Sequence, residues 1–185
     1  MQENQLYLDF FTKVLQRILS KNPTFTSAHA RPQPYFSTGI GRGGFLVFCE
    51  FNKTDKNRWQ DELRVGLFWD TKNKEKNDKI FSTLEKYGSL IEQEINQGSK
   101  WIEPNHTLIW SKSAKRERKI FVSVNGNIYS KSERIAELIS FTVVYLKRFK
   151  EFFSFFLDEL DNLPHEISQL IKNEGTPIYK LERKR

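Results

Sequence analysis

The stretches Phe45-Leu-Val-Phe-Cys-Glu-Phe51 and Leu63-Arg-Val-Gly-Leu-Phe-Trp69 decide the fold, because an apolar residue occupies every second position in both. A period of two places all of these apolar side chains on one face of a β-strand. The connection between them, 53–60, is charged and short. We therefore predict a β-hairpin with one face in the core.

Helical spacing appears on both sides of this hairpin. Apolar residues spaced three and four apart predict a helix through Tyr7–Ile18, which must stop before Asn22-Pro23 because the residue before a proline avoids helical geometry. A second helix is predicted over 78–97, with Asp78 as its N-cap. A third runs from Ser130 to Leu160, since Ser130 and Glu133 have the spacing of a capping box.

Further strands complete the sheet. The residues 100–103, 107–111 and 119–124 are predicted as short strands, and Ile128-Tyr129 as a return after the turn signal Asn125-Gly126. The order α-β-β-α-β-β-β-α predicts an α+β fold, with a single antiparallel sheet of about five strands and three packed helices. One domain is expected over 1–163, followed by a short C-terminal helix and basic tail over 164–185.

Composition narrows the class of protein. The 185 residues contain 30 Lys and Arg against 23 Asp and Glu, and the isoelectric point is about 9.4. Such a balance favours polyanionic partners. Cys49 is the single cysteine, and the N-terminus has no signal-peptide pattern. Charges such as Lys147 and Arg148 interrupt the apolar stretch 135–160. We therefore expect a cytoplasmic protein with no membrane contact.

The densest group of cations lies between two predicted strands. Its members are Lys112, Lys115, Arg116, Arg118 and Lys119, diluted by Glu117. A basic loop of this kind can follow a phosphate backbone, with DNA favoured over RNA as the partner. The alternative is a solvated loop with no ligand. Trp59, in the charged connection of the hairpin, is a candidate for stacking on a base.

A glycine-rich segment, Thr38-Gly-Ile-Gly-Arg-Gly-Gly44, precedes the first strand of the hairpin. Clustered glycines let the backbone approach a ligand, and Arg42 could contact a phosphate. A phosphate-binding loop, however, is followed by a helix, whereas here a strand follows. A tight bulge before that strand is the alternative, and we expect no cofactor.

Catalytic residues are not evident from the sequence. Glu117-Arg118-Lys119 has the Glu-x-Lys spacing of restriction-type nucleases, which hold a divalent metal through carboxylate oxygens. Glu117 precedes the apolar run, and Glu50, at the end of another strand, has Asn52 in the place of the lysine. A metal-dependent nuclease using Glu50 or Glu117 is therefore kept as an alternative, and no metal ligand is assigned.

Three motifs resemble those of a bacterial domain family of unknown function. They are Arg31-Pro-Gln-Pro-Tyr35, Gly39-Ile-Gly-Arg-Gly-Gly-Phe45 and Leu63-Arg-Val-Gly-Leu67, and the resemblance covers roughly residues 6–160. In many relatives the domain looks like the C-terminal half of a longer chain whose N-terminal half resembles a restriction-endonuclease-like nuclease. The resemblance implies a role in DNA recognition or assembly within restriction or phage-defence systems, and carries no assigned activity.

Our leading hypothesis is a non-catalytic nucleic-acid-binding or accessory module of such a nuclease system, with a nuclease or ATPase subunit as partner. The first alternative is a protein-interaction subunit, for example a homodimer. Its seam would be the aromatic stripe Tyr145, Phe149, Phe152 and Phe156 of the long helix.

Overall fold

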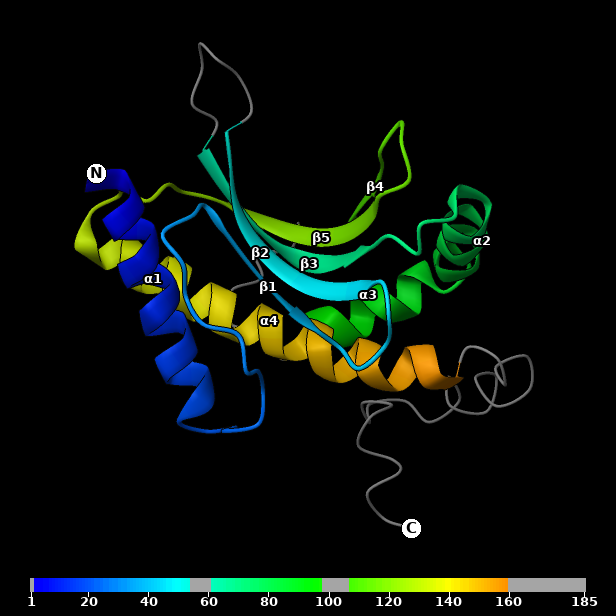
Figure 1. Cartoon of the computed structure of the whole chain (residues 1–185), viewed down its shortest axis with the longest axis horizontal. Coiled ribbons are helices and arrows are strands. Elements are labelled where there is room, and N and C mark those ends of the chain that lie inside the picture. The colour runs from blue at the N-terminus through cyan, green and yellow to red at the C-terminus, as the bar shows by residue number, and fades with distance from the viewer. Residues whose placement is uncertain (1, 54–60, 98–106, 160–185) are drawn as a thin grey trace.

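The computed structural model describes residues 2–53, 61–97 and 107–159, which form one five-stranded sheet and four helices (Figure 1). The strands are β1 (Tyr35–Gly39), β2 (Phe45–Lys53), β3 (Asp61–Trp69), β4 (Ile109–Lys112) and β5 (Arg118–Asn125). They lie in the order β1-β2-β3-β5-β4, and every neighbouring pair is antiparallel. The predicted α+β class, the single antiparallel sheet and the hairpin of β2 and β3 are confirmed.

The helices are α1 (Gln2–Leu19), α2 (Lys74–Glu85), α3 (Gly88–Asn96) and α4 (Ser132–Glu159). In Figure 1, α1, α3 and α4 lie on the convex side of the sheet, and α2 stands at the end of the sheet near β4. The other side of the sheet is concave and faces away from these helices. None of the helices described is long and apolar enough to cross a bilayer.

Alternation along the strands explains why the helices cover one side only. Val47, Cys49, Val65, Leu67 and Val122 are fully buried and point towards the helices. The long helix α4 completes this core with its aromatic side chains. Burying one such side chain stabilises the fold by about 1.5–3 kcal/mol. The aromatic side chains of the sequence lie mainly in this layer between the sheet and the helices.

One edge strand of the sheet is not predicted by the sequence pattern. Tyr35–Gly39 pairs along its whole length with β2 and forms one edge of the sheet as β1. Only Phe36 and Thr38 of this strand are buried, so the apolar alternation that marks the central strands is too short here to be seen in the sequence.

The helix predicted over 78–97 is two helices. The first, α2, begins at Lys74, and its N-cap is Asn73, whose Oδ1 accepts a 3.0 Å hydrogen bond from the amide of Lys76. Asp78 is therefore not the N-cap but lies within the helix. The chain leaves helical geometry at Tyr87, and α3 then starts at Gly88.

Two smaller predictions around α4 are also wrong. Ile128 and Tyr129 lie in a turn and form no return strand. Ser130 does not open the long helix either, because α4 starts at Ser132. The hydroxyl of Ser130 instead accepts a 3.2 Å hydrogen bond from the amide of Asn127. The strand predicted over 100–103 and the C-terminal segment 164–185 lie outside the described residues.

Candidate nucleic-acid interface

The predicted basic loop is the turn of a tight hairpin formed by β4 and β5. Lys112 is directly opposite Arg118 in the strand register, and the amide of Ser113 donates a 3.1 Å hydrogen bond to the carbonyl of Glu117. The amide of Lys115 donates to the hydroxyl of Ser113 at 3.2 Å. The side chains of Lys112, Lys115 and Arg116 are exposed. The turn therefore has a defined backbone that presents three cations to solvent.

Arg118 differs from the other members of the predicted group, because its side chain is only 2% exposed. Its Nε donates a 3.0 Å hydrogen bond to Oδ1 of Asp78 on α2, and its Nη1 donates to the carbonyls of Ser113 and Glu117 at 3.2 and 2.7 Å. A guanidinium with these partners has no face left for a phosphate. Arg118 anchors the hairpin from inside.

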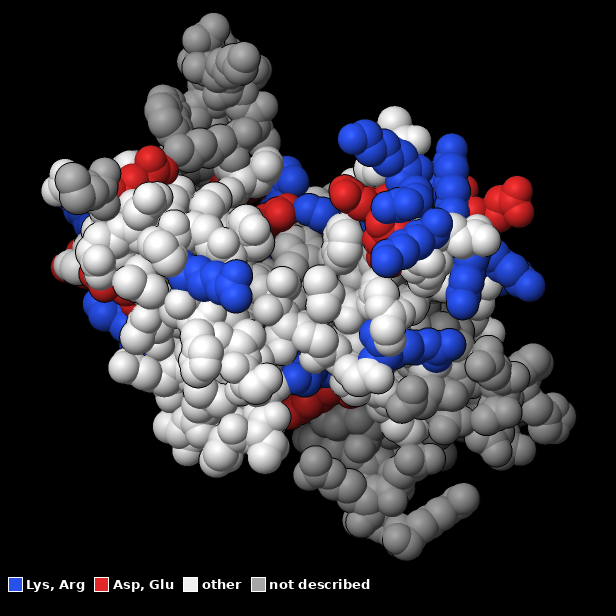
Figure 2. Space-filling view, in the orientation of Figure 1, with Lys and Arg blue, Asp and Glu red and all other residues white. Residues whose placement is uncertain are grey.

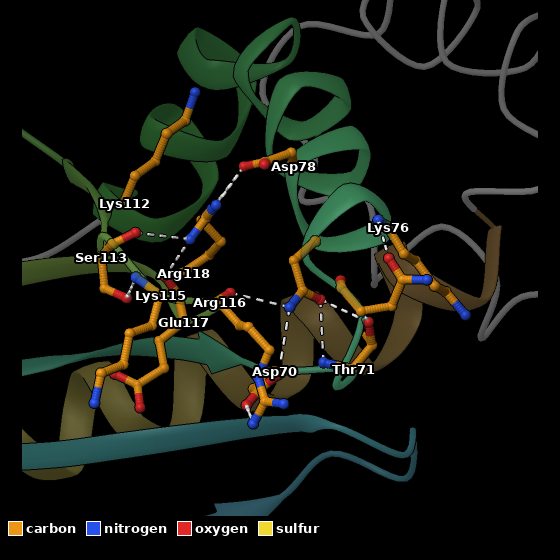
Figure 3. A network of polar contacts seen from close by, with 12 residues as sticks. Asp70, Thr71, Lys76, Asp78, Lys112, Ser113, Lys115, Arg116, Glu117 and Arg118 are labelled. Atoms are coloured by element: carbon orange, nitrogen blue, oxygen red, sulfur yellow. Dashed lines mark hydrogen bonds and ion pairs between the residues drawn. The ribbon is translucent and has the colours of Figure 1, made fainter.

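Asn77 provides a second anchor between the hairpin and α2. Figure 3 shows the polar network at this place, with Arg118 of the hairpin pointing towards Asp78 of α2. The side chain of Asn77 is fully buried, and its Nδ2 donates a 3.0 Å hydrogen bond to the carbonyl of Arg116. Its Oδ1 accepts hydrogen bonds from the amide and the hydroxyl of Thr71, at 3.0 and 2.7 Å. The turn and the start of α2 are thus held together by a side chain that water cannot reach.

Asp70 joins the same network from the end of β3. Its Oδ2 lies 3.1 Å from Nη2 of Arg116, and its Oδ1 accepts a 2.8 Å hydrogen bond from the amide of Lys72. The hydrogen bond from the amide of Lys72 is the main reason why the pKa of Asp70 is lowered, and the charge of Arg116 lowers this pKa further. Lys72 itself has a positive φ of 63°. This is uncommon for a residue with a side chain.

The lysines of α2 and of the turn before it extend the cationic surface. Lys72, Lys74, Lys76 and Lys79 are exposed, and Figure 2 shows Lys and Arg gathered at this end of the molecule. Residues 70–86 and 112–117 contain eight Lys or Arg and five Asp or Glu, an excess of three, compared with seven for the whole chain. We call these two segments together the basic end.

Sequence reasoning missed the contribution of α2, since its lysines are separated from the hairpin by about 40 residues along the chain. The available signal was a run of four lysines within 72–79. Lys112 links the two segments, because its Nζ lies 4.3 Å from the centre of the Phe81 ring and 3.9 Å from Oε2 of Glu85, both on α2.

Lys119 belongs to the predicted group but faces another surface. It lies on the concave side of the sheet, where its Nζ is 2.9 and 3.0 Å from the two carboxylate oxygens of Glu50 and 4.8 Å from the centre of the Phe48 ring. Arg64 lies next to it, pairing with Glu62 and sitting 4.9 Å from the centre of the Phe121 ring. Lys119 therefore lies at the border between the basic end and the concave side of the sheet.

Arg42, which the sequence assigned to the phosphate contacts, does not join the basic end. The guanidinium of Arg42 donates to the carbonyl of Leu157 in the last turn of α4, and the hydroxyl of Ser154 donates to the carbonyl of Ile40 at 3.2 Å. A cation at a helix C-terminus offsets the partial negative charge there. The glycine-rich segment thus fastens β1 to α4. Trp59 lies outside the described residues.

The structure bears differently on the two alternative hypotheses, which are a metal-dependent nuclease and an interaction seam on α4. Glu50 has both carboxylate oxygens on Lys119, while Glu117 is exposed at the turn. Within residues 2–53, 61–97 and 107–159, His, Cys, Asp and Glu nowhere form a group of three or more suited to a metal. The proposed aromatic seam on α4 is not a surface, since its members, Tyr145, Phe149, Phe152 and Phe156, are at most 1% exposed.

Comparison with known proteins gives one match. The model of the family described as "Domain of unknown function (DUF4268)" matches residues 6–157, which include every helix and strand named above apart from the outermost turns of α1 and α4. Neither the curated proteins nor the solved structures contain a match to the chain.

Proposed function

The chain belongs to this family of domains of unknown function (DUF4268), and we propose that the protein binds nucleic acid, with the basic end as the contact surface. The ligand chemistry is a phosphate backbone, with DNA favoured over RNA. The cations that would contact phosphates are Lys112, Lys115 and Arg116 of the hairpin, Lys76 and Lys79 of α2, and Lys72 in the turn before α2. No catalytic role is assigned.

The observation that carries the proposal is the anchoring of a cationic turn by buried polar groups. Arg118 and Asn77 make hydrogen bonds to three carbonyls of the turn, those of Ser113, Arg116 and Glu117. A turn held in this way loses little conformational entropy when a ligand binds. A loop that merely keeps the protein soluble needs no such support, so the arrangement favours a recognition role.

The proposed setting is an accessory module of a restriction or phage-defence nuclease system in the cytoplasm, with a nuclease or ATPase subunit as partner. The support for this part is the motif resemblance, which implies that relatives carry the domain next to a nuclease. Co-expression with a nuclease subunit encoded beside this chain, followed by size-exclusion chromatography, tests it. Separate elution of the two proteins, with or without DNA, would contradict the assignment.

Fluorescence anisotropy titrations at about 50 and 200 mM salt test the binding itself. The probes are labelled DNA and RNA of about 20 nucleotides, each as single strand and as duplex. We expect affinity to fall steeply with salt, because bound cations release counterions from the phosphates. Replacing Lys115 and Arg116 together by alanine should weaken binding and reduce the slope of log K against log salt by about 1.4–1.8, roughly 0.7–0.9 per lost phosphate contact.

The matched control removes two cations elsewhere. Lys13 on α1 and Lys21 after it are exposed, and α1 lies at the opposite end of the sheet from α2 (Figure 1). The Lys13→Ala/Lys21→Ala double variant has the same net charge as the test variant. We expect it to bind as the wild type does. Equal losses in both double variants, or no salt-dependent binding of any probe, would refute the proposed function.

A further inference from the structure

The concave side of the sheet carries an ordered array of side chains that the basic end does not use. Strand register places them in rows across the sheet, and the central row runs Ser37, Phe48, Gly66, Phe121 and Ile109. The rows beside it contain two further half-buried apolar side chains, the ion pairs and several small polar groups. These are Leu46, Phe68, Lys119 and Ser111 on one side, and Tyr35, Glu50, Arg64 and Ser123 on the other.

The charges on this surface are balanced. Lys119 is held by Glu50, and Arg64 is held by Glu62, so that two cations face two carboxylates. What this array offers a ligand is therefore chiefly apolar area and uncharged hydrogen-bonding groups. The most exposed apolar side chains are at its two edges, where Tyr35 on β1 is 51% exposed and Ile109 on β4 is 40% exposed.

Lys119 makes this surface continuous with the basic end. It is the last residue of the cationic run that starts at Lys112, and its side chain reaches across the concave side to Glu50 on β2. In Figure 1 the turn between β4 and β5 rises on the concave side of the sheet, so the exposed cations of the turn stand at its rim. A ligand bound at the rim would thus meet the array directly.

We propose that the nucleic acid bound by this protein is single-stranded, with its bases on the concave side of the sheet and its phosphates along the basic end. The inference rests on the proposed function. Unstacked bases need apolar faces and hydrogen-bonding groups, which this surface supplies. A duplex keeps its bases inside and presents phosphates, so it would need an excess of cations where the charges are in fact balanced.

The central rings are not the stacking platform. Phe48 and Phe121 are about 5% exposed, because Lys119 and Arg64 lie over their faces. Among the described residues of this face, the half-buried Phe68 and the exposed Tyr35 are the aromatic side chains that a base can reach. The single variants Tyr35→Ala and Phe68→Ala therefore test the proposal. Tyr129→Ala is the matched control, since Tyr129 is 58% exposed but lies outside the sheet, between β5 and α4.

The experiment uses the full chain and the same labelled probes of about 20 nucleotides. We expect single strands to bind more tightly than the duplex of the same sequence. Each of the two sheet variants should weaken single-strand binding at least about fivefold, the lower bound for losing one stacked base, whereas Tyr129→Ala should not. Circular dichroism confirms that the variants are folded, and Tyr35→Ala alone decides if Phe68→Ala does not fold.

The outcomes separate this inference from the proposed function. If the duplex binds as tightly as the single strand, or if Tyr35→Ala binds single strands as the wild type does, the concave side is not the site of the bases. The proposed function then still stands, provided that the Lys115→Ala/Arg116→Ala variant loses affinity. If the wild type binds none of the probes, both proposals fail together.

Discussion

Nζ of Lys119 on β5 lies 2.9 Å from Oε1 of Glu50 on β2, although β3 runs between these two strands. The register shows what lies beneath this pair. Glu50 is opposite Arg64 of β3, Lys119 is opposite Phe68, and the residue on the same face between Arg64 and Phe68 is Gly66. The ion pair therefore crosses the sheet at the one position of this face of β3 that has no side chain.

Gly66→Ala should destabilise the protein strongly. A Cβ at this position would lie 2.1 Å from the carbonyl oxygen of Ile120 and 2.5 Å from Cβ of Phe121, so β5 would have to move. We expect a loss of at least about 2 kcal/mol in the free energy of unfolding, as for other overpacked sites. Urea denaturation followed by circular dichroism measures it.

The control for this substitution is Gly39→Ala on β1, where a Cβ would meet no atom within 4 Å. We expect its unfolding free energy to stay within about 0.5 kcal/mol of the wild type. If Gly66→Ala unfolds at the same urea concentration as Gly39→Ala, the close approach of β3 and β5 is not as described.

Asn77→Ala tests the anchoring of the hairpin without changing any charge. The substitution leaves the amide of Thr71 and the carbonyl of Arg116 without their buried partner, which we expect to cost about 2–3 kcal/mol of stability. Proteins that remain folded should also bind nucleic acid more weakly, because the cations of the turn lose their fixed position. The exposed N-cap variant Asn73→Ala is the control, with a cost of about 1 kcal/mol and unchanged affinity.

The pH dependence of stability should report on Asp78. Hydrogen bonds from the guanidinium of Arg118 lower the pKa of this carboxyl below its ordinary value of 3.8. A group with a lowered pKa in the folded state stabilises the fold above the unfolded pKa, and the contribution is lost as the pH falls through the folded pKa. We therefore expect Asp78→Asn to lower the Tm near neutral pH, and the difference from the wild type to shrink below pH 3.8. A difference that stays constant down to pH 3 or so would show that the carboxylate charge is not what holds Arg118.

Phe152→Ala distinguishes core from interface on α4. The side chain is 1% exposed in a single chain and stacks on Phe156 at a centroid distance of 5.1 Å. We expect a loss of about 3–5 kcal/mol in unfolding free energy, with no change in the oligomeric state measured by light scattering. Dissociation of a dimer by this substitution, with the monomers still folded, would restore the aromatic seam as an interaction surface.

The fold could be predicted where periodicity was long. The alternation of Phe45–Phe51 and Leu63–Trp69 identified the two central strands, and the helical spacing around Phe10 and Phe149 identified α1 and α4. The edge strand β1 could not be predicted in this way, because two buried side chains form no recognisable pattern. The break between α2 and α3 at Tyr87 was hidden, since the apolar spacing continues through it.

The candidate site could be predicted only in part, because the number of charged residues in a segment does not show which way their side chains point. Lys115 and Arg116 are exposed as expected, whereas Arg118 is buried. A signal for this was present in the sequence, since Arg118 is in phase with Ile120 and Val122, which face the helices. The contribution of α2 depends on a contact between residues about 40 positions apart, which no local pattern contains.

The bond between Arg42 and the carbonyl of Leu157 has a consequence for how the protein is made. Its two partners are 115 positions apart, and Ser154 and Ile40 are 114 apart. On the ribosome, the edge strand of the sheet leaves the exit tunnel long before the helix end that fastens it. Contacts of such sequence separation slow folding, since the intervening chain must be ordered first. We expect nascent chains that stop short of Ser154 to remain sensitive to protease, and protection to arise only once Leu157 has emerged.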